Sequence, residues 1–480
     1  MRYGENAPFM EEEFPGNNDK NQEARQSVER YEEMLRKKDA YFFDVDAFLQ
    51  IIENYIEKND PVKALEVVTF AQSQHPDSVE FLLRHAQLLA MVDRTEEALQ
   101  ILEKAEVLMP KEADVHMIRG SIYSHQLRFE EAIASFNKAI PLAEEKDLLY
   151  LNLAYVYETW GDYEKATDNL KQCLAHNPNN EIALYELTFC YEFTERVTEG
   201  IQFLLSFIDE HPYSYAAWYN LGNSYNRIDR FEEAVDAYDF SMAIKDDFSA
   251  AYFNKGNTLA NMEKYAEAIE CYKRTFEFEA PDALTYYSIG ECYEQLDDMH
   301  RAREYYKKAT KLDPTQTQAW LGLGITLQHE ERWFEALHYL RKALELDPDN
   351  GEVWFAVGDA EYHLGNYQGA EKAYSKVIEL ERDNSDIWLE YSHLLIADSR
   401  PDEAIALLEE GIRLHPDETE LIYRLASYQY TTGKIQEAYH TLQDALEQNP
   451  DLAHTLFEYS AVLENDQNII RLIEFYKNHP

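Results

Sequence analysis

Cysteine is scarce in this chain, and its few cysteines are widely spaced. Cys173, Cys190, Cys271 and Cys292 are the only four among 480 residues, and no two of them form a Cys-x-x-Cys pair. This spacing excludes a disulfide framework and a zinc site built from cysteine pairs. All four fall at positions that the repeat pattern described below predicts to be helical, so we expect small, buried side chains.

Long hydrophobic runs are missing too. No stretch approaches the roughly 18 apolar residues that a membrane-spanning helix needs. The N-terminus reaches the acidic run of residues 11–13 without the apolar segment of a secretory signal. These two absences predict a cytoplasmic protein.

Basic residues are in short supply, since 44 Lys and Arg face 91 Asp and Glu and the formal net charge is −47. Binding to nucleic acid and to anionic membrane surfaces relies on Lys and Arg, so we expect neither as a partner. The acidity has two interpretations: it keeps a long apolar chain soluble, or it attracts basic polypeptides. We therefore expect a protein or peptide partner, with basic segments as one alternative.

Motifs for catalysis are absent from the chain. It contains no nucleophile elbow, no phosphate-binding loop and no His-Glu-x-x-His. The nearest approach is His329-Glu330-Glu331, which lacks the second histidine. We therefore expect no enzymatic activity, no cofactor and no metal; a metal or cofactor in purified protein would favour the alternative of an enzyme on an unusual template.

What the sequence does have is a fixed period of 34 residues. Self-similarity at this length predicts a solenoid of stacked two-helix units, in which each unit contacts only its neighbours. The period is carried by a small residue, alanine or once glycine: Ala64, Ala98, Ala132, Ala166, Gly200, Ala234, Ala268, Ala302, Ala336, Ala370, Ala404 and Ala438.

Other positions of the repeat have plain physical roles when Val45 is position 1. Small residues at positions 8 and 20 let the two helices of a unit approach closely. Proline closes eight of the twelve repeats at position 32, where it ends the second helix. Glycine stands in the turn between the helices at Gly161, Gly365 and Gly433, where a left-handed backbone favours it. Tryptophans fill position 4 in four repeats: Trp218, Trp320, Trp354 and Trp388.

These residues resemble the tetratricopeptide repeat family over residues 45–480. The resemblance implies an all-α fold, a right-handed superhelical solenoid of about twelve 34-residue helix-turn-helix repeats with a partial C-terminal capping repeat. It also implies a non-catalytic interaction scaffold that binds partner polypeptides in the concave groove. The sixth repeat carries the signature most fully, with Trp218, Leu221, Gly222, Tyr225, Phe231, Ala234 and Tyr238.

The chain is expected to divide into four segments. Residues 1–20 should be a disordered acidic leader, and residues 21–44 an N-terminal capping helix with Val28, Tyr31 and Leu35 on one face. A detachable partner-binding helix is the alternative for the second segment. Residues 45–452 hold the twelve repeats, and residues 453–480 a partial capping repeat.

In the family, positions 2, 5, 6, 9, 12 and 13 of the first helix point into the groove, and helical spacing places them on one stripe. In repeats four to eight this stripe combines aromatic rings, asparagines and interleaved acids such as Glu158, Glu186 and Glu192. The asparagines are similar to the ladders of long-array family members such as the O-linked N-acetylglucosamine transferase. An amide can both donate to and accept from a peptide backbone. The predicted partner-binding residues are Asn152, Tyr155, Tyr185, Phe189, Tyr219, Asn220, Asn223, Phe253, Asn254, Asn257 and Tyr287.

Two other interpretations of this stripe remain open. The asparagines belong to the common family pattern, and an inert lining would show them as well. A dicarboxylate clamp of the co-chaperone type is not expected, because Tyr219 and Phe253 stand where that clamp needs lysine. The alternative function is a self-associating structural or assembly factor. The oligomeric state is not fixed by the sequence, and light scattering would separate the two functions.

Some repeats depart from the pattern. The fifth has Gly200 in place of alanine, Phe207 where a small residue is usual and Glu195 in the turn, which predicts altered superhelical geometry nearby. The closing proline is missing from repeats three, six, seven and ten, which have Glu144, Asp246, Ala280 and Arg382.

Overall fold

The computed structural model describes residues 17–37 and 41–478, and within these ranges all regular structure is helical. Residues 1–16 of the expected leader lie outside the described residues. Helix α1 (Asn17–Lys37) begins inside the segment assigned to the leader.

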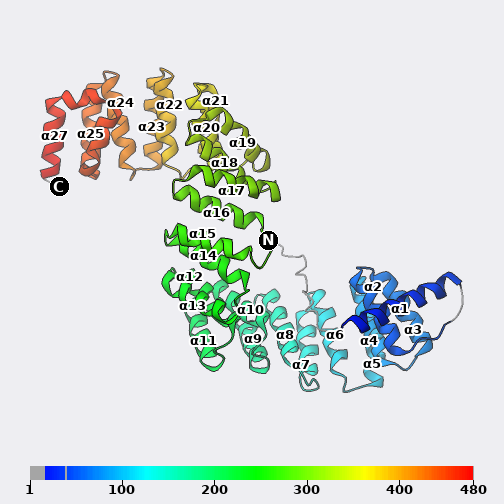
Figure 1. Ribbon diagram of the computed structural model, residues 1–480. Coiled ribbons are helices and arrows are strands. Elements are labelled where there is room, and N and C mark those ends of the chain that lie inside the picture. Colours follow the sequence, from blue (N-terminus) through cyan, green and yellow to red (C-terminus); the bar gives the residue numbers. More distant parts are fainter. Residues whose placement is uncertain (1–16, 38–40, 479–480) are drawn as a thin grey trace. The chain divides into compact units, whose positions relative to one another are not determined.

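Each of the twelve repeats forms a pair of helices, A and B, as the 34-residue period predicts (Figure 1). The A helices are α2 (Val45–Glu57), α4 (Val79–Met91), α6 (Ala113–His125), α8 (Asp147–Trp160), α10 (Glu181–Phe193), α12 (Tyr215–Arg227), α14 (Ser249–Asn261), α16 (Ala283–Gln295), α18 (Thr317–Gln328), α20 (Gly351–His363), α22 (Asp386–Ala397) and α24 (Thr419–Thr431). The B helices are α3 (Pro61–Gln74), α5 (Thr95–Leu108), α7 (Phe129–Ala139), α9 (Tyr163–His176), α11 (Val197–Glu210), α13 (Phe231–Ile244), α15 (Tyr265–Thr275), α17 (Met299–Leu312), α19 (Trp333–Leu346), α21 (Tyr367–Leu380), α23 (Pro401–Leu414) and α25 (Ile435–Gln448).

The chain divides into two compact units, Met1–Ile244 and Lys245–Pro480. The division falls in the link between repeats six and seven, both of which lack the closing proline. Repeats one to six therefore belong to the first unit and repeats seven to twelve to the second.

A left-handed residue ends every A helix at position 15. Glycine is not required there, because φ is positive at nine other residues as well as at Gly161, Gly365 and Gly433. The next amide then bonds back five residues, as Arg128 N does to Tyr123 O at 2.9 Å, which satisfies a carbonyl at the helix end. The non-glycine residues are Asn59, Asp93, Leu127, Glu195, Asp229, Glu263, Asp297, Glu331 and Ser399.

At five of the six glycines in position 8, an aromatic ring at position 24 of the same repeat explains the glycine, and at Gly324 the side chain of Leu340 does so. A Cβ added to Gly222 would lie 2.6 Å from the Tyr238 ring, and one added to Gly256 would lie 2.7 Å from Tyr272. Tyr238 and Tyr272 are almost completely buried. Helix B thus packs against helix A by inserting a ring where helix A has no side chain.

Tryptophan at position 4 joins one repeat to the proline that closes the previous one. The indole of Trp218 donates to Pro212 O at 3.0 Å, and Trp320 does the same to Pro314 O at 2.9 Å. Repeat ten ends with Arg382 in place of this proline, and the buried indole Nε1 of Trp388 in repeat eleven has no hydrogen-bond partner among the described residues. Helix α22 there begins at Asp386, one residue later than the period predicts.

Two of the other repeats without proline have a shortened B helix. Helix α7 ends at Ala139 and α15 at Thr275, so each has 11 residues, whereas the other B helices have 14. The links that follow are correspondingly longer.

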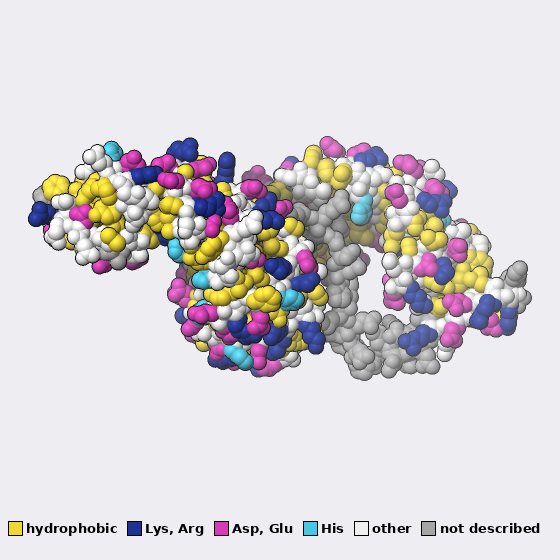
Figure 2. Space-filling view, turned by 90° about the horizontal axis from the view of Figure 1, so that it is seen from above, with side chains coloured by type: hydrophobic (Ala, Val, Ile, Leu, Met, Phe, Trp, Pro, Cys, Tyr) yellow, Lys and Arg dark blue, Asp and Glu magenta, His cyan; other side chains and the backbone are white. Residues whose placement is uncertain are grey.

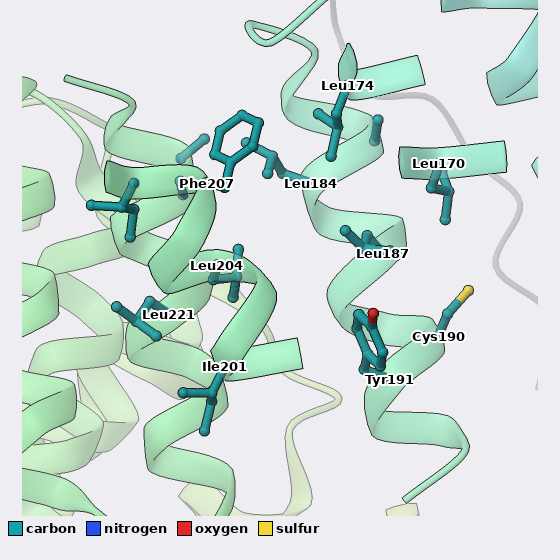
Figure 3. Packing of buried hydrophobic residues seen from close by; sticks show 14 of the residues in the cluster. Leu170, Leu174, Leu184, Leu187, Cys190, Tyr191, Ile201, Leu204, Phe207 and Leu221 are labelled. Atoms are coloured by element: carbon teal, nitrogen blue, oxygen red, sulfur yellow. The ribbon is translucent and has the colours of Figure 1, made fainter. Parts of the chain in front are cut away.

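The fifth repeat packs differently from its neighbours in the first unit. Helices α10 and α11 contact each other less extensively than α8 and α9 do, whereas α10 contacts α12 directly. Figure 3 shows Leu187 and Tyr191 of α10 on the side toward Leu204 of α11, with Phe207 of α11 next to Leu184 of α10. The bulk of Phe207 at a usually small position explains the separation, because two closely packed helices would leave no room for it.

The two ends of the array are covered by further helices. Val28, Tyr31 and Met34 of α1 are buried against α2, whereas Leu35, expected on that face, is 54% exposed. At the other end η1 (Pro450–His454), α26 (Thr455–Tyr459) and η2 (Ala461–Asn465) replace a continuous A helix. The last helix is α27 (Gln467–Asn478), whose Ile469 and Ile473 are buried in one cluster with residues of α25.

Candidate functional site

A cavity of about 700 Å³ lies among the A helices α4, α6 and α8 of the first unit. Most of the exposed surface of its lining is apolar, although seven of the twelve lining residues are polar. The residues that line it are Gln87, Ala90, Met91, Asp93, Thr95, Met117, Ile118, Ser121, Ile122, His125, Gln126 and Asn152.

The sequence interpretation missed all of these residues except Asn152. The signal was available, because Ala90 and Met91 occupy positions 12 and 13 of repeat two, and Met117 and Ser121 occupy positions 5 and 9 of repeat three. These positions belong to the same inward stripe, but the predicted partner-binding residues were taken only from repeats four to eight. Methionine suits such a surface, since its flexible thioether adapts to partners of different shape.

Asn152 and Tyr155 extend this surface along α8. Asn152 lines the cavity while its Nδ2 donates to Leu148 O on its own helix at 2.8 Å. Tyr155 lies three residues further and is exposed. The predicted residues of repeat four therefore adjoin the cavity.

Helix α10 contributes a row of exposed aromatic rings. Tyr185 and Phe189, both predicted, are 57% and 41% exposed. Phe193 is 60% exposed and had not been predicted, although it occupies position 13 of the inward stripe. Its ring centroid is 5.8 Å from that of Phe189 and 4.5 Å from that of Tyr163.

Carboxylates lie among these rings and are partly desolvated. Burial, together with repulsion from Glu186, raises the pKa of Glu158 to about 7. Burial also raises the pKa of Glu186 and of Glu192. The Cys190 thiol of α10 donates to Glu158 Oε1 of α8 at 3.4 Å, which ties the two helices together at this point. No Lys, Arg or His of the described chain forms an ion pair with Glu158 or Glu186.

The predicted residues of α12 are less accessible. Asn220 is only 3% exposed, and its Nδ2 donates to Ala216 O at 2.8 Å. Its buried Oδ1 accepts no hydrogen bond from any residue that the structure describes. Asn223 Oδ1 accepts a hydrogen bond of 2.8 Å from the Tyr238 hydroxyl. Tyr219 is half-buried, with its ring centroid 6.0 Å from that of Tyr238.

The same arrangement recurs in the second unit, which holds the remaining predicted residues. Asn257 Oδ1 accepts from the Tyr272 hydroxyl at 2.7 Å, and Phe253 packs against the Tyr272 ring at 5.5 Å. Asn254 is half-buried on the same helix. Tyr287 is half-buried, and its hydroxyl donates to Glu291 Oε1 at 2.7 Å. Asn223 and Asn257 thus hold the position-24 ring that packs on the position-8 glycine, a structural task that their sequence position did not reveal.

Charges of both signs are interspersed on the face in Figure 2, with exposed hydrophobic side chains between them. In the described parts of the chain no three His, Cys, Asp or Glu side chains are grouped so that they could hold a metal ion. The same parts contain no helix with the length and apolar character needed to cross a bilayer.

Sequence models of the tetratricopeptide repeat match residues 148–180, 215–242, 249–279, 283–316 and 317–350. The model of the cytochrome c-type biogenesis protein H TPR domain matches residues 335–454. The chain belongs to the tetratricopeptide repeat family. A model of the ChAPs, the Chs5p-Arf1p-binding proteins, also matches residues 20–162 of this tetratricopeptide repeat protein.

No curated protein matches the chain. Among solved structures it is similar to YrrB, a TPR protein with an unusual peptide-binding site, at 22% identity over 38% of this chain and 93% of YrrB, with a TM-score of 0.33. It is similar to the APC/C hetero-tetramer Cut9-Hcn1 at 15% identity over 78% of this chain and 88% of that one, with a TM-score of 0.41. MamA shares 28% identity over 35% of this chain and 97% of its own, with a TM-score of 0.31.

Proposed function

We propose that this tetratricopeptide repeat protein is a non-catalytic interaction scaffold that holds an extended or helical segment of a partner protein. Proteins of this family generally mediate protein–protein interactions. The observation that carries the proposal here is the apolar cavity among α4, α6 and α8, with the exposed rings of Tyr155 and Tyr185 beyond it. Contiguous exposed apolar surface on a soluble protein is typical of a site for another polypeptide.

The composition of the cavity favours an apolar side chain as the anchor of the bound segment. Met91 is 56% exposed and would lose that exposure on binding. Asn152 and Gln87 at the cavity offer amides that can pair with a peptide backbone. We also propose that the protein acts in the cytoplasm, which the absence of a cysteine framework in the sequence supports.

The test fills the cavity without removing any of its walls. Ser121→Trp places a large ring in the cavity, whereas Val107→Trp adds the same ring to α5 at a residue that is 80% exposed and does not line the cavity. Peptides selected from a random library on the full-length protein are then measured by fluorescence anisotropy. We expect them to lose binding to Ser121→Trp and to keep it with Val107→Trp. Equal binding to both variants would overturn the proposal.

A further inference from the structure

The surface shared by α8 and α10 combines carboxylates with exposed rings, and its makeup points to one kind of ligand group. We define the acid–aromatic surface as Glu158, Glu186, Tyr155, Tyr185 and Phe189. We propose that this surface receives an arginine side chain of the bound segment, next to an apolar side chain of the same segment in the α4–α6–α8 cavity. The inference rests on the proposed function and specifies the partner's chemistry.

The first argument is that the two carboxylates lack a counter-charge. Some carboxylates at or below the surface have one: Arg119 Nη2 lies 2.7 Å from Glu106, and Arg341 Nη2 lies 3.2 Å from Glu361. Glu294, which is half-buried, instead accepts a hydrogen bond of 2.7 Å from the Tyr306 hydroxyl. Glu158 and Glu186 repel each other and form no ion pair with any described residue. Desolvated charge without a partner is costly, so a cation from outside would remove a cost that the unbound protein carries.

The second argument is that the rings around the carboxylates suit a planar cation. The guanidinium of arginine stacks on aromatic faces and also donates paired hydrogen bonds to a carboxylate, whereas an ammonium does only part of this. The chain already uses this pairing internally: the Arg128 guanidinium lies 4.4 Å from the centroid of Tyr123, and that of Arg230 lies 4.6 Å from that of Tyr225. The rings of Tyr155, Tyr185 and Phe189 are exposed, and no Lys or Arg of residues 17–37 and 41–478 lies over any of them.

The third argument is the position of the surface. Asn152 lines the apolar cavity, and Tyr155 follows it by three residues on the same helix, so the two sites adjoin along α8. A single segment can therefore place an apolar side chain in the cavity and a cation between α8 and α10. The overall charge of −47 favours the approach of a basic segment over an acidic one.

The surroundings of Glu158 also predict that its protonation state changes when the arginine binds. The groups that interact with it are Tyr155 on its own helix, Tyr163 on α9, and Glu186 and Cys190 on α10, and none of them is a cation. A bound guanidinium would lower the pKa of Glu158, so binding near neutral pH should release a proton. Calorimetry in buffers of different ionisation enthalpy measures this release.

The experiment uses full-length protein and peptides selected from a random library. Each arginine-containing peptide is compared with a version in which citrulline, neutral and of nearly the same shape, replaces the arginine. The protein variants are Glu158→Gln and Glu186→Gln, with Glu164→Gln on α9 as a matched control that removes one exposed carboxylate outside the surface. Circular dichroism confirms that each variant is folded.

We expect the selected peptides to be enriched in arginine. Citrulline, Glu158→Gln and Glu186→Gln should each weaken binding about tenfold, the effect of losing a charged hydrogen-bond partner, and Glu164→Gln should have no effect. In Glu158→Gln the advantage of the arginine peptide over the citrulline peptide should shrink, because only Glu186 is left to pair with the guanidinium.

Other outcomes distinguish a failure of the arginine subsite from a failure of the proposed scaffold function. Peptides that lose binding to Ser121→Trp but contain no arginine, or tolerate citrulline within twofold, would overturn the arginine subsite and leave the scaffold proposal standing. Binding of free arginine or a polyamine as tight as that of the peptides would also overturn it, since the ligand would then be a small cation. Peptides indifferent to Ser121→Trp would overturn both.

Discussion

At the scale of single residues, the carboxylate of Glu158 should lower the stability of the unbound protein while favouring the binding of an arginine. Its pKa is raised to about 7 by burial and by Glu186. A raised carboxyl pKa means that the folded state holds a proton that the unfolded state has released. Stability therefore falls as pH rises from the ordinary value of the carboxyl through about 7. The proposed arginine would offset this loss only when the partner is bound.

Glu158→Gln should therefore stabilise the unbound protein at high pH. We expect a gain of about 1 kcal/mol near pH 8 and almost none near pH 5, after discounting the pKa shift for the partial exposure of the side chain. Urea unfolding of the wild type and the variant at both pH values measures it. A variant less stable than the wild type at pH 8 would show that the carboxylate is paired in the folded state after all.

Leu127 has a backbone conformation that is unfavourable for leucine. It adopts φ of 58° in the turn that ends α6, although leucine has neither the freedom of glycine nor the short polar side chain of asparagine. The side chain is 62% exposed, so little apolar burial offsets the strain.

Leu127→Gly should stabilise the protein by about 0.5–1 kcal/mol, because glycine adopts this conformation without a Cβ clash. The reverse change, Gly161→Leu, is the matched control. Gly161 has φ of 86° and no atom within 4 Å of an added Cβ, so backbone strain alone should destabilise it by a similar amount. Thermal or urea unfolding compares the two, and changes of equal sign would contradict the argument.

At the scale of helices, the 34-residue period predicted a pair of helices in every repeat, and eleven of the twelve A helices begin at position 1. Small residues at positions 8 and 20, together with proline at position 32, are local constraints that any stacked pair must satisfy. It did not predict which inward side chains stay accessible. Asn220 is buried, and Asn223 and Asn257 each accept a hydrogen bond from a tyrosine fifteen residues further along the chain. The accessibility of these asparagines depends on tyrosines of helix B. The pattern of inward positions on helix A carries no information about those tyrosines.

The fifth repeat was expected to be unusual from Gly200 and Phe207, and its two helices do pack less closely than those of repeat four. The sequence predicted an altered superhelical geometry near this repeat, and that stays a prediction. What the structure shows is a looser contact between the two helices of the repeat itself. Local opening has a low free energy where few buried contacts resist it.

Helix α11 should therefore exchange its amide hydrogens faster than α9, the equivalent helix of the preceding repeat. We expect roughly tenfold lower protection, equivalent to about 1.4 kcal/mol less opening free energy. Hydrogen exchange with mass spectrometry on the intact chain compares peptides from the two helices. Equal protection would indicate that the contact of α10 with α12 compensates for its looser contact with α11.

At the scale of the whole molecule, net charge has opposite consequences for folding and for binding. Many of the ion pairs join exposed residues three apart, such as Arg94–Glu97 and Arg332–Glu335. Pairs of this kind contribute little. The uncompensated charge of −47 repels itself, so screening by salt should favour the folded state.

Raising sodium chloride from low to physiological concentration shortens the screening length from about 30 to about 8 Å. We expect the urea midpoint to rise over this range, while association with an arginine-containing peptide slows and weakens because the same screening reduces its attraction. The citrulline peptide, with one charge fewer, should weaken less. The two responses to salt, a rise in folding stability and a fall in peptide affinity, would show that repulsion among the acidic residues dominates over specific ion pairs. A fall in stability with salt would show instead that attractive ion pairs dominate in the folded state. The net charge could then not be ascribed to solubility or to a basic partner.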